Sequence, residues 1–172
     1  MVLANVPLLF YSKHPFLSTR DHRVVRYECL RCHQDAEFMV GFNAHLGFRL
    51  AEWRADYARM EVAITDVHLN RSGIVHGGLY ATMLDAAAGY TGVWTPPGAP
   101  RQRAVTLSLT TNYLGKVSAG KVICESRRVG GGRAIFYAEG VVRDDAGTVL
   151  ATGQSTHRIR TTWTEDRHDC AE

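Results

Sequence analysis

The sequence predicts an α+β fold in which one long helix lies across one face of an antiparallel sheet. Residues 77–94 form a run of small and apolar residues with the length of a helix, and the proline-rich segment 95–100 would end it. Alternating apolar and polar residues indicate two strands before this run and four strands after it. A chain of 172 residues suits one domain. We therefore expect a single domain over 34–160, between an extension at 1–33 and a polar tail at 161–172.

The segment before the long helix is expected to contain a short helix and two strands. Apolar residues at helical spacing predict the short helix at 34–46. Strands are expected at 47–54 and 57–65. The second of these has an apolar residue at every other position from Ala58 to Ile64, which is the pattern of a strand with one buried face.

The second half of the chain has the pattern of an antiparallel meander. The expected strands run from Val105 to Tyr113 and over 121–129, 133–143 and 148–160. The links at 130–132 and 144–147 are rich in glycine or aspartate and have the composition of hairpin turns.

The charge of the chain is unevenly distributed. The net charge of +3 is too small to indicate a nucleic-acid partner. Residues 101–160 carry ten Lys or Arg and four acids, a net +6 (10 − 4), whereas the remainder is net −3. This excess fits either solvated strand faces or attraction to an anionic ligand such as a nucleotide phosphate. No apolar run approaches the ~20 residues of a membrane helix, and no basic leader is present, so we expect a cytoplasmic protein with no membrane partner.

The four cysteines are Cys29, Cys32, Cys124 and Cys170, and free thiols are expected in a cytoplasmic protein. The run Cys29–His33 has the spacing of a haem attachment site, or of half a zinc ligand set. Haem attachment requires an oxidising compartment, and no second half of a zinc site is obvious. We therefore interpret the run as a coincidence of ordinary residues and expect no metal and no cofactor.

The start of the long helix is the first candidate site. Unpaired backbone N–H groups and the positive end of the helix dipole lie at a helix start. Gly77 and Gly78 remove side chains there, so an oxyanion or a polarised carbonyl could approach the backbone. Alternatively, the two glycines only allow a tight turn against the sheet. His76, which precedes them, either fixes this turn by hydrogen bonding or acts as a base.

Asp85 is the second candidate, because a carboxylate in an otherwise apolar helix costs several kcal/mol unless it is paired or hydrated. It either hydrogen-bonds a neighbouring strand or serves as a base or nucleophile facing a cleft. Gly77 and Asp85 are eight residues apart, about 12 Å along a helix. One helix cannot bring both groups to one reacting carbonyl. If they cooperate, they come from two subunits, which predicts a dimer with two equivalent sites.

These residues also match a family pattern. Asn70, Gly73, His76-Gly77-Gly78 and Thr82-Met83-Leu84-Asp85 strongly resemble the hotdog-fold acyl-CoA thioesterases, specifically the phenylacetic-acid-degradation thioesterase group. Leu109–Leu114 and Gly147–Gly153 are similar to the same family. The resemblance covers about residues 36–160 and leaves the extension unexplained.

The resemblance implies a single hotdog domain, assembled as a homodimer or a dimer of dimers, that hydrolyses an acyl-CoA to a free acid and CoA. Asp85 would be the general base or nucleophile, and the backbone N–H of Gly77 would polarise the thioester carbonyl. Asn70 would help to place the water or the thioester. His76 would shape the turn, and the hydroxyl of Thr106 would position water. Some members of the family carry Glu where this chain has Asp85.

The chemistry fits one carboxylate and a helix end, because a thiol with a pKa near ~8.5 leaves without a strong general acid. The phosphates of CoA would lie on the positive half of the chain. The expected substrate-binding residues are Gly78, Arg128, Gly131, Arg133 and Ser155, with Thr156 and His157 behind them. Four large side chains either line an aryl or medium-chain acyl pocket or belong to the core: Tyr80, Met83, Tyr90 and Trp94.

Two other functions remain open. A hotdog dehydratase or hydratase acting on acyl thioesters would need His76 as its base. A non-catalytic acyl-CoA-binding protein would bind the ligand without turnover.

Overall fold

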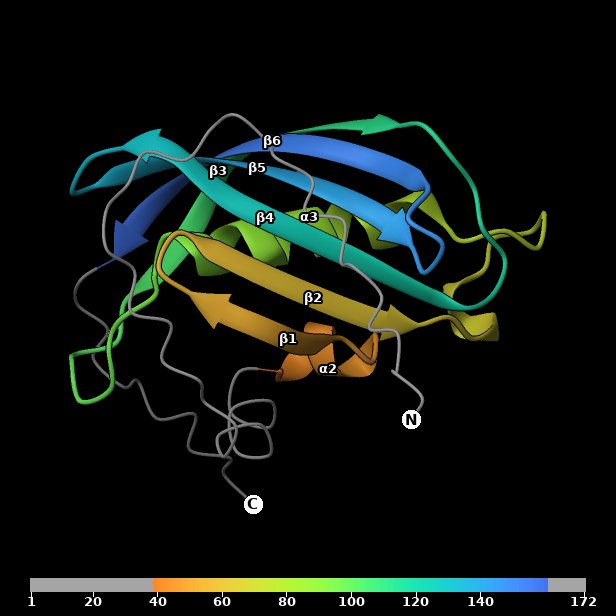
Figure 1. Cartoon of the computed structure of the whole chain (residues 1–172), viewed down its shortest axis with the longest axis horizontal. Coiled ribbons are helices and arrows are strands. Elements are labelled where there is room, and N and C mark those ends of the chain that lie inside the picture. The colour runs from red at the N-terminus through yellow and green to blue at the C-terminus, as the bar shows by residue number, and fades with distance from the viewer. Residues whose placement is uncertain (1–38, 161–172) are drawn as a thin grey trace, which may run out of the picture.

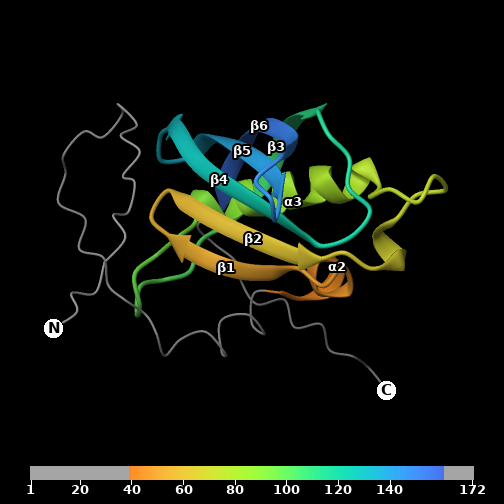
Figure 2. The ribbon, with the colours of Figure 1, turned by 45° about the vertical axis from the view of Figure 1, so that its right-hand side comes forward.

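The computed structural model describes residues 39–160, which form one six-stranded antiparallel sheet with a long helix against one face (Figure 1). The predicted α+β fold is confirmed. Figure 2 shows the sheet curving around the helix α3. The extension, the tail and the Cys29–His33 run lie outside the described residues. The elements in chain order are α2 (Gly41–His45), β1 (Arg49–Arg54), β2 (Tyr57–Ala63), η1 (Asp66–His68), α3 (Gly77–Thr91), β3 (Arg103–Tyr113), β4 (Lys121–Gly131), β5 (Ile135–Asp144) and β6 (Val149–Arg160).

The strand order in the sheet is β1-β2-β4-β5-β6-β3, so β1 and β3 are its edges. The predicted meander of four strands is therefore wrong for the first of them: β4, β5 and β6 pair in sequence order, whereas β3 pairs with the last strand, β6. Val105, Leu107 and Tyr113 of β3 are exposed, and no other strand among residues 39–160 pairs with the outer edge of β3. The edge strand β3 is 11 residues long.

The strand ends differ from those predicted by up to two residues, and three differences among the elements have a visible physical cause. Within the described residues the short helix spans only Gly41–His45, because Val40 is extended and Gly41 has a φ of +56°. The long helix begins at Gly77 as predicted but ends at Thr91, whose hydroxyl donates to the carbonyl of Ala88 at 2.8 Å.

The third difference concerns the hairpin between β4 and β5. It does not begin at Gly130, because Gly130 and Gly131 continue β4 and pair with Tyr137 and Phe136 after a bulge. The N–H of Gly132 donates to the carbonyl of Ile135 at 2.7 Å and closes the hairpin. Residues 132–134 therefore form the link, and β5 begins two residues later than predicted.

Helix α3 approaches the sheet closely where two strands carry glycine. Gly140 of β5 and Gly153 of β6 are paired neighbours. A Cβ at Gly140 would lie 2.8 Å from a methyl group of Leu84, and a Cβ at Gly153 would lie 3.0 Å from the other. The fully buried Leu84 thus occupies a hollow that only glycine leaves open. Because Leu84 precedes Asp85, this contact fixes where the carboxylate lies.

The core lies between α3 and the sheet. Of the four side chains considered for an acyl pocket, Tyr80 and Met83 belong to this core, Tyr90 is half-buried and packs against it, and Trp94 is half-buried. Cys124 is a free, buried thiol, as expected, and burial raises its pKa. Within residues 39–160 no helix is long and apolar enough to cross a membrane.

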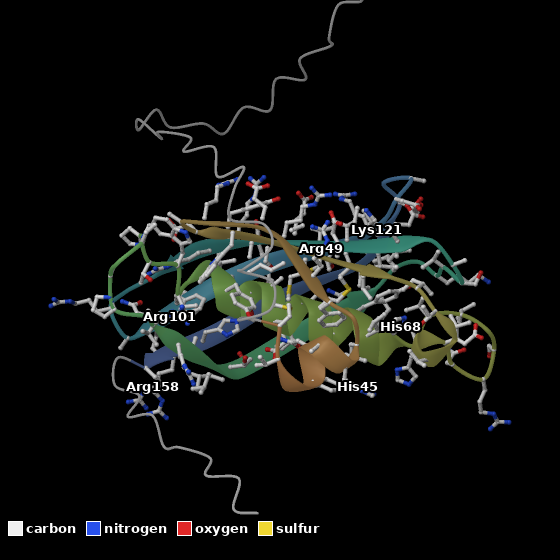
Figure 3. The ribbon with its side chains drawn as sticks, turned by 90° about the horizontal axis from the view of Figure 1, so that it is seen from below. His45, Arg49, His68, Arg101, Lys121 and Arg158 are labelled. Atoms are coloured by element: carbon white, nitrogen blue, oxygen red, sulfur yellow. The ribbon has the colours of Figure 1, made fainter. Side chains whose placement is uncertain are left out.

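Some of the basic side chains form ion pairs within the fold. Glu61 is only 5% exposed, although it lies on a strand that was expected to alternate. Arg49 donates to its carboxylate at 2.6 Å, and Lys121 lies 3.3 Å from the same oxygen (Figure 3). Burial alone would raise the pKa of Glu61, but the hydrogen bonds from these two cations lower it. Lys121 is therefore part of a cluster of ion pairs around Glu61.

Candidate active site

The loop before α3 is shaped by Asn70. Its side-chain Oδ1 accepts a hydrogen bond from the N–H of Ser72 at 2.8 Å, and its carbonyl accepts one from Gly73 at 2.9 Å. Gly73 has a φ of +71°, which glycine adopts without strain. The oxygen of the Asn70 amide thus holds this turn, and its expected contact with a water or a thioester stays a prediction.

His76 caps the start of α3. Its Nδ1 accepts a hydrogen bond from the N–H of Gly78 at 2.9 Å, and its backbone N–H donates to the carbonyl of the buried His68 at 2.8 Å. This is the turn-fixing arrangement rather than that of a free base. A Cβ at Gly78 would lie 2.9 Å from His76 Nδ1, so the glycine makes room for the cap.

Gly77 presents the open donor at the helix start. The N–H of Gly78 is taken by His76, and the N–H of Leu79 donates to the His76 carbonyl at 2.9 Å. Among the residues described, none accepts a hydrogen bond from the N–H of Gly77. The ring of Tyr113 lies beside it, 3.1 Å from where a Cβ would be, and is 56% exposed. The two glycines therefore have different functions in the geometry: Gly78 allows the turn, and Gly77 offers a donor.

Asp85 is half-buried on α3, facing the edge strand β3. The hydroxyl of Thr106 donates to its Oδ1 at 2.6 Å. This distance lies within the usual range for a hydroxyl that donates to a carboxylate oxygen. The sequence left open whether Asp85 bonds a strand or acts as a base. In the structure one oxygen is held by a strand, and Oδ2 has no hydrogen-bond partner among residues 39–160.

Two further side chains lie behind this pair. The ring of His157, which is 1% exposed, has its Nδ1 3.3 Å from Thr106 Oγ1 and its Nε2 2.8 Å from Ser155 Oγ. The ring stacks on Phe136, with centroids 4.8 Å apart. Ser155 was expected to bind substrate, but its hydroxyl is buried and bonded to His157. The sequence did contain a signal for Ser155 and His157. Both are polar residues on the face of β6 that points toward α3, where the preceding residues on that face are alanine and glycine.

The two candidate groups do not meet within one chain. Gly77 and Asp85 lie on the same helix, about 12 Å apart along its axis. The helix start adjoins His68, whose carbonyl accepts a hydrogen bond from His76, whereas Asp85 lies further along α3 and is bonded to Thr106 of β3. The open donor of Gly77 and the carboxylate of Asp85 are therefore separate features of one chain.

The residues expected to hold phosphates lie at the β4–β5 hairpin. Arg128 does not project from it: its guanidinium donates to the carbonyls of Gly130 and Gly132, at 3.4 and 3.2 Å, and lies over the ring of Phe136. Gly131 has a φ of +120°, and a Cβ there would lie 2.4 Å from the Phe136 backbone. Both residues thus shape the hairpin, while Arg133 is exposed in its link.

His157 gives folding stability a defined dependence on pH. Burial lowers the pKa of its imidazole, although the negative charge of Asp85 acts in the opposite direction. The unfolded chain, with an ordinary histidine pKa of about 6.5, therefore binds a proton at pH values where the folded chain does not. We expect the free energy of unfolding to fall as the pH drops below about 6.5, by at most about 1.4 kcal/mol per pH unit for this one group.

Urea unfolding at pH 7.5 and 5.5 measures this effect. The variant His157→Gln, which cannot titrate there, should lose less stability than the wild-type chain over the same interval. An equal loss in both proteins would show that other groups cause the acid sensitivity.

Comparisons with known proteins identify a family model and several relatives. Residues 72–151 match the family model of the thioesterase superfamily. This segment includes Gly77, Asp85 and Thr106. The protein named "Putative esterase Rv1847" from Mycobacterium tuberculosis is 27% identical over 116 residues, which cover 67% of this chain and 83% of that protein.

Solved structures show the same fold. A structure of the same mycobacterial protein has a TM-score of 0.65 and 24% identity, covering 73% of this chain and 100% of that chain. The thioesterase HI1161 from Haemophilus influenzae has a TM-score of 0.64 at 17% identity, covering 78% and 92%. Zebra fish thioesterase superfamily member 2 has a TM-score of 0.63 at 21% identity, covering 73% and 94%. The architecture is therefore that of the hotdog thioesterases.

Proposed function

We propose, from the match of residues 72–151 to the thioesterase superfamily, that this chain hydrolyses a thioester, and that its substrate is an acyl-CoA. The observation that carries the proposal is the carboxylate of Asp85, half-buried on α3 and held through one oxygen by Thr106 at 2.6 Å. The motif resemblance to the phenylacetic-acid-degradation group supports CoA as the thiol. The half-buried Tyr90 and Trp94 favour an aryl or medium-chain acyl group.

In the proposed reaction, Asp85 accepts a proton from water while the water oxygen bonds to the thioester carbonyl carbon. The carbonyl oxygen becomes an oxyanion, which the N–H of Gly77 stabilises. The oxyanion then collapses, the carbon–sulfur bond breaks, and CoA leaves as a thiolate that takes up the proton. In the alternative with Asp85 as nucleophile, its oxygen bonds to the carbonyl carbon and the carbon–sulfur bond breaks, which releases CoA as a thiolate and leaves a mixed anhydride. Water then cleaves the anhydride, which releases the free acid, regenerates the Asp85 carboxylate and supplies the proton that the thiolate takes up.

The proposal requires two subunits, because the Gly77 and Asp85 of one chain lie about 12 Å apart on one helix. The exposed edge of β3 supports a homodimer in which two copies of this strand pair across a two-fold axis. Thr106 lies on that strand, so the pairing would bring Asp85 to the boundary between the subunits. Two such dimers could assemble further into a dimer of dimers. Arg133 on the exposed hairpin is the proposed contact for a CoA phosphate.

A panel of acyl-CoAs with a thiol-detecting reagent tests the function. Release of free CoA from at least one aryl or medium-chain substrate supports the thioesterase. Addition of water to an enoyl-CoA without thiol release would favour the hydratase, which the cap formed by His76 Nδ1 disfavours. Tight binding of an acyl-CoA with neither reaction would favour a binding protein.

Mixing two inactive variants tests the shared site. Gly77→Val and Asp85→Asn should each be inactive, because each damages both sites of its own homodimer. After subunit exchange, a mixed dimer carries one site with both defects and one with neither. Random mixing should restore activity at about one quarter of all sites. Native mass spectrometry would verify the exchange, and a mixture that contains mixed dimers without any regained activity would contradict the shared site.

A further inference from the structure

Three side chains from three adjacent strands form a row beneath α3. Phe136 of β5, His157 of β6 and Thr106 of β3 are register partners across the sheet. The row meets the helix at Asp85, whose Oδ1 receives the hydrogen of Thr106. A bulge between Thr106 and Ser108 keeps Thr106 on the helix-facing side of β3.

The hydrogen bonds in this row have one consistent direction. Thr106 has a single hydroxyl hydrogen, and at 2.6 Å it is donated to the carboxylate of Asp85, which can only accept. Thr106 Oγ1 can then only accept from His157, so His157 Nδ1 must carry the proton. The Nε2 of a neutral ring is then an acceptor, and Ser155 must donate its hydroxyl hydrogen to it. Every donor in the chain points toward Asp85.

We infer that His157 and Ser155 are positioning residues, which hold the Thr106 hydroxyl as a donor to Asp85 Oδ1 and so direct Oδ2 at the reacting water or carbonyl. The inference deepens the proposed function and rests on it. Neither residue is placed against the substrate, because both are buried and act through Thr106. Without the Nδ1 hydrogen, the hydroxyl of Thr106 could rotate and Asp85 would lose its fixed partner.

Burial supports a neutral ring in this position. The surroundings of His157 lower its pKa, so at neutral pH it carries one ring hydrogen rather than two. Buried polar groups are rarely left unbonded, and both nitrogens of this ring have partners. A ring that only filled space against Phe136 would not need Ser155 or Thr106.

Kinetics of variants test the inference. His157→Phe keeps an aromatic ring against Phe136 but removes both nitrogens, and kcat should fall roughly 10- to 100-fold with little change in KM. His157→Asn retains an N–H near the position of Nδ1 and should recover part of this loss. Thr91→Val, which removes another buried hydroxyl on α3, is the matched control and should keep the wild-type kcat. A folded His157→Phe protein with wild-type kcat, or equal losses in the Phe and Asn variants, would overturn the inference.

A double-mutant cycle separates positioning from packing. If His157 acts through Thr106, then His157→Phe should have almost no further effect on kcat in a Thr106→Val background. Independent, multiplicative losses would show that His157 affects the site by another route.

The tautomer of His157 gives a readout that does not depend on activity. Nitrogen-15 NMR of the imidazole should show a proton on Nδ1 and a bare Nε2 in the wild-type protein at neutral pH. A proton on Nε2 would refute the hydrogen-bond direction, even if the chain proves to be a thioesterase. An Nδ1 proton in a chain that hydrolyses no thioester would instead refute the proposed function while leaving the geometry of the row intact.

Discussion

Replacing Asp85 with asparagine is expected to lower kcat for acyl-CoA hydrolysis by roughly 10²- to 10⁴-fold. Asparagine has nearly the same shape, and its amide oxygen can still accept the hydrogen bond that Thr106 donates at 2.6 Å. It can neither take a proton from water nor attack a carbonyl. The fold should therefore persist while the chemistry is lost. Steady-state release of free CoA measures the rate, and thermal unfolding verifies the fold.

Two further variants make this experiment specific. Glu139→Gln neutralises an exposed carboxylate on the opposite face of the sheet and should leave kcat unchanged. Asp85→Glu keeps the carboxylate but lengthens its reach, so it should retain more activity than Asp85→Asn. A folded Asp85→Asn protein that releases CoA at the wild-type rate would remove Asp85 from the mechanism.

The second large effect is expected on stability, from alanine at Gly92. A Cβ there would lie 2.3 to 2.5 Å from three ring carbons of Phe136, which no packing allows. Phe136 is fully buried and stacks on His157, so it cannot move without shifting that ring. We expect Gly92→Ala to cost roughly 1–3 kcal/mol in the free energy of unfolding, as overpacked core positions do. Activity should fall as well, because His157 contacts Thr106.

Gly89, which lies within α3 three residues before the C-cap residue Gly92, provides the control. A Cβ at this position would have no neighbour within 4 Å. Gly89→Ala should therefore stabilise the chain by roughly 0.5–1 kcal/mol, since alanine is the better helix residue. Urea unfolding of both variants compares the two. If Gly92→Ala were as stable as Gly89→Ala, the close contact between α3 and Phe136 would be wrong.

Most of the fold could be predicted because helices and strands differ in the spacing of their apolar residues along the sequence. The slim apolar run after Gly77 and the alternation in the second half are local patterns, and they are enough to indicate a helix on an antiparallel sheet. The hairpin was misplaced because glycine looks like a turn residue. Gly130 and Gly131 instead continue β4, where Gly131 meets the backbone of Phe136 more closely than a side chain would permit.

The candidate site could be predicted where a residue conflicts with its local surroundings. Asp85 was visible as a charge in an apolar helix, and Gly77 as a gap at a helix start. His157 was named only as a residue behind the phosphate contacts, because its contact with Thr106, 51 residues away in sequence, depends on the pairing of β3 with β6 and on the bulge after Thr106. The hydrogen bonds that the side chains of Arg128 and Ser155 make likewise depend on how the folded strands and hairpin place their partners.

The open edge of β3 also has a consequence for how this protein behaves in solution. Chains usually protect such an edge against runaway pairing by placing lysine, proline or a very short strand there. Here the strand is 11 residues long, and it exposes Val105 and Leu107 on either side of Thr106. A charged residue at either position would protect the edge from pairing. It would also lie next to Thr106, which holds the carboxylate of Asp85. The same strand thus favours assembly and aggregation alike, so conditions that dissociate the proposed dimer in concentrated samples should promote precipitation.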